Sequence, residues 1–203
     1  MMAIIHSLLL LICLWICPFS IAFSQELDLI KYKLWDIKDT LQWSDYTFSD
    51  LNQDLEYGFQ AKAVTSLAHI YVPGVWHVDS CMNVLVAFRK RYSFTGDTTH
   101  ADLLAHESIH FDIAEVFARY LRKELLNLSE SSNNNLDEYL TLRNRYFKEA
   151  TNYQDLYDQE TVYGLNTKEQ RRWASHIKAE LKIWEDYSFE NTLLQCNSLV
   201  NNK

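Results

Sequence analysis

Residues 103–111 read LLAHESIHF and contain the pattern HExxH, formed by His106, Glu107 and His110. On a helix, residues four apart lie about 40° from one another around the axis, so the two imidazoles converge on one point that can hold a metal ion. Glu107 projects about 100° from His106, beside the pair, where a carboxylate can take a proton from metal-bound water. This stretch predicts a metal hydrolase.

The HExxH stretch belongs to a longer helical pattern that starts after residues 97–99 (DTT) and runs to about Leu128 with no Pro or Gly. The side chains of residues 97–99 are expected to cap its first backbone N–H groups. Glu115 falls about 180° from His106, which excludes it as a ligand, so the third ligand must come from elsewhere in the chain. Both histidines lie in a stripe expected to face the core, with Leu103, Ile113, Phe117, Leu121 and Leu128.

A second informative stretch, residues 157–164, reads YDQETVYG. If it is helical up to Gly164, Asp158 and Glu160 point about 160° apart, so at most one of the two acids can face the metal. We favour Asp158. Two histidines and one acid leave a fourth position for water, which a catalytic zinc needs.

The first 24 residues have the character of a leader. They contain no Asp, Glu, Lys or Arg, and an apolar run is followed by Pro18 and by small residues up to Ser24. This predicts a signal peptide at 1–24, export to the cell exterior or the periplasm, and no stable membrane association after cleavage. An uncleaved anchor is the alternative, although the run is short for a membrane span.

Residues 25–203 are long enough for one domain with a core. A net charge of −8 argues against nucleic acid and anionic membrane surfaces as partners, because both require basic patches. Two cysteines remain after cleavage, Cys81 and Cys196. In an exported chain they form either one disulfide or two separate thiols.

The predicted fold class is α+β, with a small antiparallel or mixed sheet in the N-terminal half, followed by the long HExxH helix and further helices. Strand-like runs lie at Trp35 and at residues 41–43, 63–65, 68–72 and 83–88. A second helix is expected from Asp137 to about Tyr163, and a capping box at residues 167–170 (TKEQ) opens the last one. The expected core positions of these two helices are Leu140, Tyr146, Phe147, Ala150, Tyr153, Trp173, Ile177, Leu181 and Trp184.

These motifs resemble those of DUF922, a family of predicted secreted zinc-dependent proteases from bacteria. The family's helix L-x-x-H-E-x-x-H-F-D-I-x-E is similar to residues 103–115, and its Y-D-x-x-T-x-H-G element and following Q-x-x-W are similar to residues 157–164 and 170–173. The resemblance extends from about Leu41 to Trp184. It implies a single zincin-like metalloprotease domain that binds Zn²⁺ and acts on peptide or protein substrates.

Tyr163 departs from the family pattern, which has His before the Gly. If that His is the family's third ligand, zinc binding here is weakened or depends on a phenolate. If Asp158 is the ligand, Tyr163 can donate a hydrogen bond to the oxyanion of the transition state. The Tyr-Gly pair is also similar to the D-x-x-Y-G element of fungal aspzincin proteases, which favours Glu160 as the ligand.

We therefore expect a secreted zinc-dependent peptidase that hydrolyses peptide bonds with metal-activated water, with Glu107 as general base and Tyr163 as a further catalytic residue. The metal ligands are expected to be His106, His110 and Asp158. Because Tyr163 replaces the family His, the alternative is a secreted non-catalytic binding protein with a structural or vestigial metal site. A third hypothesis makes both histidines ordinary core residues without a metal.

Overall fold

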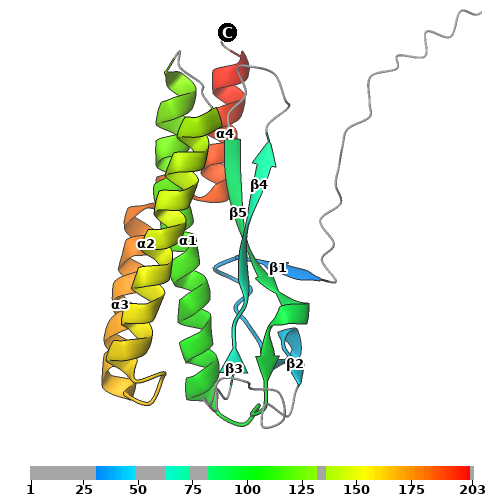
Figure 1. The fold of residues 1–203 in the computed structure, drawn as a ribbon, viewed down its shortest axis with the longest axis vertical. Helices are drawn as coiled ribbons and strands as arrows, with labels where there is room; N and C mark the ends of the chain where they lie inside the picture. Colours follow the sequence, from blue (N-terminus) through cyan, green and yellow to red (C-terminus); the bar gives the residue numbers. More distant parts are fainter. Residues whose placement is uncertain (1–30, 49–62, 74–81, 132–135, 202–203) are drawn as a thin grey trace, which may run out of the picture.

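The predicted α+β fold class is confirmed by a computed structural model, which describes residues 31–48, 63–73, 82–131 and 136–201 (Figure 1). The leader predicted at 1–24 and Cys81 lie outside these residues. Six strands precede four helices in the described part: β1 (Tyr32–Leu34), β2 (Thr47–Phe48), β3 (Ala63–Val64), β4 (Leu67–Pro73), β5 (Met82–Arg89), β6 (Phe94–Thr95), α1 (Ala101–Glu130), α2 (Leu136–Thr161), α3 (Thr167–Ile183) and α4 (Phe189–Asn201).

The strands form two small sheets. In the larger one β5 lies in the centre and pairs antiparallel with β1 on one side and β4 on the other. In the smaller one β6 pairs parallel with β2 and antiparallel with β3. Val84, Val86 and Phe88 alternate along β5 and are almost completely buried, because their shared face packs against α1.

Helix α1 is the central element of the fold. It packs against β5 on one side and against α2 and α3 on the other (Figure 1). The expected apolar stripe is confirmed at Ile113, Phe117 and Leu121, all of which are buried. More than half of the residues of α1 are buried, so the helix has a second buried face that the apolar stripe does not account for.

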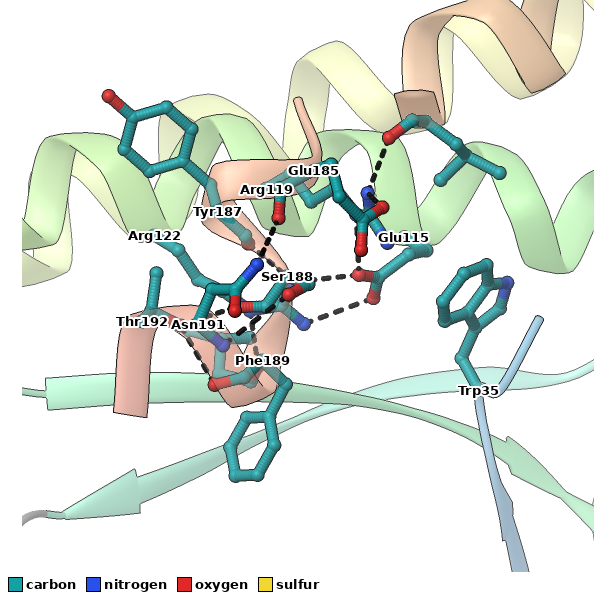
Figure 2. Close-up of polar contacts among 12 residues, drawn as sticks. Trp35, Glu115, Arg119, Arg122, Glu185, Tyr187, Ser188, Phe189, Asn191 and Thr192 are labelled. Carbon is teal, nitrogen blue, oxygen red and sulfur yellow. Dashed lines mark hydrogen bonds and ion pairs between the residues drawn. The ribbon is translucent and has the colours of Figure 1, made fainter. Parts of the chain in front are cut away.

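That second face carries a network of charged side chains, shown in Figure 2. The Glu115 carboxylate accepts hydrogen bonds from Arg119 Nε at 2.9 Å, Arg122 Nη1 at 2.7 Å and Arg122 Nη2 at 3.0 Å. Arg122 also donates to the backbone carbonyl of Val84 in β5. The two guanidinium groups reach further backbone carbonyls at the end of α3 and in the 3₁₀ turn that follows it (Glu185–Tyr187). The network therefore fastens α1 to the sheet and to the C-terminal segment.

Three sequence-based details were wrong. Residues 41–43 do not form a strand; Trp43–Asp45 is a 3₁₀ turn, because the Asp45 carboxylate accepts the backbone N–H of Gln42. The N-terminal cap of α1 is His100, whose side chain makes no capping hydrogen bond to the helix backbone. The N-terminal cap of α3 is Asn166, whose side chain accepts the backbone N–H of Glu169. The capping box predicted at residues 167–170 was therefore placed one residue too late.

Two expected core positions on α2 are instead exposed. Phe147 is 62% exposed and Leu140 is 38% exposed, whereas Tyr146 and Ala150 are buried. Helix α4 was not predicted, and it packs against β5 and α1. Cys196 on this helix is disulfide-bonded, which contradicts two separate thiols, while its pairing with Cys81 stays a prediction. No helix in the described part of the chain is long and apolar enough to cross a membrane.

Candidate metal centre

Two helices bring together the three residues that the sequence favoured as ligands. His106 and His110 lie one turn apart on α1, and Asp158 faces them from the last turn of α2. Asp158 Oδ1 lies 3.1 Å from His106 Nε2 and 3.0 Å from His110 Nε2. The two Nε2 atoms are 3.3 Å apart. The three atoms thus form a nearly equilateral triangle.

This triangle fits a tetrahedral zinc ion. With metal–ligand bonds of about 2.0–2.1 Å, neighbouring ligand atoms of a tetrahedron lie about 3.3 Å apart. Two imidazole nitrogens and one carboxylate oxygen are also a donor set that zinc accepts. The side chains of His110 and Asp158 are 14% and 27% exposed, so the triangle is accessible from the adjoining pocket.

His110 is held by Gln154, one turn before Asp158 on α2. The Gln154 amide nitrogen donates to the backbone carbonyl of His110 at 3.0 Å, which turns its Oε1 toward the imidazole. His110 Nδ1 donates to that oxygen. The hydrogen bond fixes the tautomer with a lone pair on Nε2, which is the atom that points at Asp158.

Tyr157 supports both histidine rings. Its ring stacks on His106 with centroids 4.6 Å apart and meets His110 edge-on at 5.0 Å. Its hydroxyl donates to the backbone carbonyl of His106 at 3.3 Å. Burial raises the pKa of Tyr157, so the phenol stays neutral.

The electrostatics of the centre favour a negatively charged carboxylate beside the two histidines. Burial alone would raise the pKa of Asp158, but the close contacts of its Oδ1 with His106 and His110 outweigh burial and hold the pKa well below its usual range. Burial alone would lower the pKa of His110, but the groups around it, the Asp158 carboxylate foremost, outweigh burial, so the pKa of His110 is raised. The same anionic oxygen is suited to a cationic metal.

Glu107 follows His106 directly on α1 and is only 5% exposed. It lines a pocket of about 910 Å³ together with the three candidate ligands. The pocket is bounded by the β3–β4 segment, α1, α2 and the turn after α2. Its walls are mostly apolar or small side chains, including Ala63, Val64, Leu67, Leu103, Ala114, Phe147, Ala150, Val162 and Leu165.

The other candidates for the third ligand lie elsewhere. Glu160 is ion-paired with Arg172 and accepts the indole N–H of Trp173 at 2.8 Å, so its carboxylate belongs to the α2–α3 contact. Tyr163 lines the pocket but is 59% exposed. Glu160 does not belong to the group of acidic and histidine side chains in the described residues that could hold a metal ion, which is His106, His110 and Asp158.

The turn after α2 has an unusual backbone. Val162, Tyr163 and Gly164 have φ angles of 51°, 52° and 82°, and the left-handed region is disfavoured for a β-branched residue such as Val. A Cβ at Gly164 would lie 3.1 Å from Cγ of His106, so Gly allows the turn to approach the imidazole. The turn thus presents Tyr163 at the rim of the pocket and packs Gly164 against a candidate ligand.

Sequence reasoning missed Gln154, Tyr157 and Gln170 as neighbours of the centre. Gln154 precedes Asp158 by four residues, so helical spacing alone places it on the same face. Tyr157 and Gln170 open the two elements that resemble the family, residues 157–164 and 170–173, but their contacts with the centre depend on how α2 and α3 pack against α1.

The comparisons with known proteins agree with the resemblance noted in the sequence. Residues 86–164 match the family described as "Bacterial protein of unknown function (DUF922)", while no curated protein and no solved structure matches the chain. The matched segment includes His106, Glu107, His110 and Asp158 and ends at Gly164. Residues 86–164 of the chain are thus similar to the DUF922 family.

Proposed function

We propose that this protein is an exported zinc-dependent peptidase, with His106, His110 and Asp158 as metal ligands and Glu107 as general base. The observation that carries the proposal is the triangle of ligand atoms, 3.0–3.3 Å on each side, which shares one pocket with Glu107. A peptide or protein is the substrate class.

His106, His110 and Asp158 would hold the zinc ion, which would supply a water with its pKa lowered toward about 7 and a Lewis acid for a substrate carbonyl. The chain's own contribution is to hold the metal and to move a proton. Glu107 accepts the proton of the attacking water and delivers it to the leaving nitrogen as the C–N bond breaks. The buried position of Glu107 limits competition from bulk water.

The pocket supports a substrate with an apolar side chain next to the scissile bond. One turn beyond His110 on α1 lies Ala114, and one turn before Gln154 on α2 lies Ala150. These two small residues leave room between the helices beside the centre, and the exposed ring of Phe147 flanks that space. An apolar side chain placed there removes apolar surface from water on both partners.

Tyr163 is proposed as a second group that acts on the substrate. Its position on the pocket rim and its exposed side chain support a hydrogen bond from the phenol to the developing oxyanion. Its role is secondary to that of Glu107, because the oxyanion also has the metal as a partner.

The test is to replace Glu107 by Gln and to measure both zinc content and cleavage of a mixed peptide library by mass spectrometry. E107Q should retain zinc and lose about 10²- to 10⁴-fold in kcat/KM, the usual contribution of a general base. E149Q, at an exposed carboxylate on α2, is the control and should cleave like the parent. An E107Q variant that cleaves as fast as the parent excludes this mechanism.

A non-catalytic binding protein with a metal site is the second candidate, because Tyr163 stands where the family pattern has His. A parent protein that binds zinc tightly and cleaves no member of the library would support this alternative over the peptidase.

A further inference from the structure

The two candidate histidine ligands differ in how their second ring nitrogen is satisfied. His110 Nδ1 donates to Gln154 Oε1. His106 Nδ1 is buried without a hydrogen-bond partner, although the residue is only 3% exposed. In the described part of the chain, just one other buried side-chain nitrogen or oxygen lacks a partner, and it is Oε1 of Gln170. A buried donor and a buried acceptor are thus both unsatisfied, which is uncommon enough to need an explanation.

The His106 side chain and Gln170 Oε1 both lie beside Gly164. A Cβ built on Gly164 would be 3.1 Å from Cγ of His106 and 3.3 Å from Oε1 of Gln170. Gln170 is 6% exposed, and its amide nitrogen donates to the backbone carbonyl of Asp102 at 2.9 Å. This bond fixes which end of the amide is the donor, so Oε1 is the end available as an acceptor.

The contact of Gln170 with α1 repeats the contact made by Gln154. Each glutamine donates its amide N–H to a backbone carbonyl of α1, of His110 in one case and of Asp102, one turn before His106, in the other. Gln154 then accepts from the imidazole with its Oε1. A histidine that binds a metal through Nε2 carries its proton on Nδ1 and nearly always donates it to an oxygen acceptor.

Although the structure shows no hydrogen bond between the two atoms, we propose that Gln170 is the positioning residue of His106 and accepts its Nδ1–H when the metal is bound, as Gln154 accepts that of His110. The contact selects the tautomer with a free lone pair on Nε2 and holds the ring toward Asp158. Gly164 is part of the same arrangement, because a side chain there would occupy the space between the imidazole and the amide. The inference rests on the proposed metal site but not on peptidase activity.

Two substitutions of Gln170 separate this role from a structural one. Q170L removes both the acceptor and the donor to Asp102. Q170E keeps an acceptor oxygen but loses the donor. If Gln170 served only to fasten α3 to α1, both variants would behave alike; if it positions His106, only Q170L should weaken the metal site.

The experiment measures the zinc dissociation constant by competition with a chromophoric chelator, using the full chain. Q170L should bind zinc about 10- to 100-fold more weakly than the parent, the usual cost of losing such a partner, and Q170E should stay within about threefold. In proton NMR spectra of ¹⁵N-histidine-labelled protein, the Nδ1–H signal of His106 should be protected from exchange in the parent and in Q170E but not in Q170L. Thermal unfolding of the zinc-free variants confirms that each is folded.

Three outcomes are decisive against the inference or its basis. Unchanged zinc affinity in Q170L, or equal losses in Q170L and Q170E, overturns the role of Gln170 and leaves the metal site standing. A parent that takes up no zinc overturns the metal site itself.

Discussion

Helix α1 carries two buried polar clusters that differ in how fully their groups are satisfied. The network of Glu115, Arg119 and Arg122 is saturated by ion pairs and backbone carbonyls, and none of its buried side-chain atoms lacks a partner within the described residues (Figure 2). The cluster around His106 faces a pocket, leaves one buried nitrogen unsatisfied and directs two imidazoles at one carboxylate. The first cluster holds α1 against the sheet and the C-terminal segment. The second cluster could hold a metal ion.

The largest expected effect comes from breaking the saturated network. Replacing Glu115 by Ala leaves the almost completely buried guanidinium group of Arg122 without a carboxylate, and leaves that of Arg119 with only the exposed Glu185. We expect the free energy of unfolding to fall by about 3–5 kcal/mol in urea denaturation. E149A removes an exposed carboxylate at the same i,i+4 spacing and should cost less than about 0.5 kcal/mol. Similar losses of unfolding free energy in E115A and E149A would show that the network does not stabilise the packing of α1.

The sequence predicted the convergence of His106 and His110 but not the network of Glu115, Arg119 and Arg122, and the reason is physical. HExxH has a fixed spacing from which helix geometry predicts that His106 and His110 converge. For the third ligand the sequence favoured Asp158 but left Glu160 and Tyr163 open. The buried charges at Arg119 and Arg122 look like a solvated face in a one-dimensional pattern. Their burial depends on carbonyls of β5 and of the turn after α3, which are distant in sequence.

Other parts of the fold depend on tertiary contacts for the same reason. The pairing of β1 and β4 with β5 requires register information that short strands do not carry. Phe147 has the helical spacing of a core residue, yet it is exposed because the pocket lies where a core neighbour would be. The approach of Gln170 to His106 follows from the packing of α3 on α1, which no local pattern specifies.

The next effect in size distinguishes the metal centre from the network. With free zinc at about a hundredfold above the dissociation constant, removal of the metal should lower the free energy of unfolding by about 2.7 kcal/mol. The same chelator should leave the stability of H110A unchanged, because that variant lacks a ligand. The two proteins are compared by urea denaturation with and without chelator. If the chelator leaves the parent's stability unchanged as well, His106 and His110 are core histidines without a metal.

The smallest effect concerns His69, which lines the pocket and whose pKa is affected by the charges of Arg122 and Glu115. Burial lowers the pKa of His69, and the Arg122 guanidinium lowers it further against the opposing hydrogen bond to the Ala114 carbonyl. Below about pH 6.5, His69 therefore binds a proton more readily in the unfolded chain than in the folded protein. Stability should fall as the pH drops below 6.5, by at most about 1.4 kcal/mol per unit from this residue.

Urea denaturation of zinc-free protein between pH 7 and pH 5 tests that dependence. H69Q keeps an N–H donor for the Ala114 carbonyl but does not titrate, so it should show a shallower decline than the parent. H176Q, which removes a histidine from the surface of α3, is the control. A decline in H69Q as steep as that of the parent would remove His69 from the explanation.

The central claim is that Asp158, and not Glu160, completes the metal site with His106 and His110. Elemental analysis of the parent, D158N and E160Q after dialysis against one zinc buffer tests it directly. We predict one zinc ion per chain in the parent and in E160Q, and loss of zinc from D158N. Zinc retained by D158N but lost from E160Q would contradict the account.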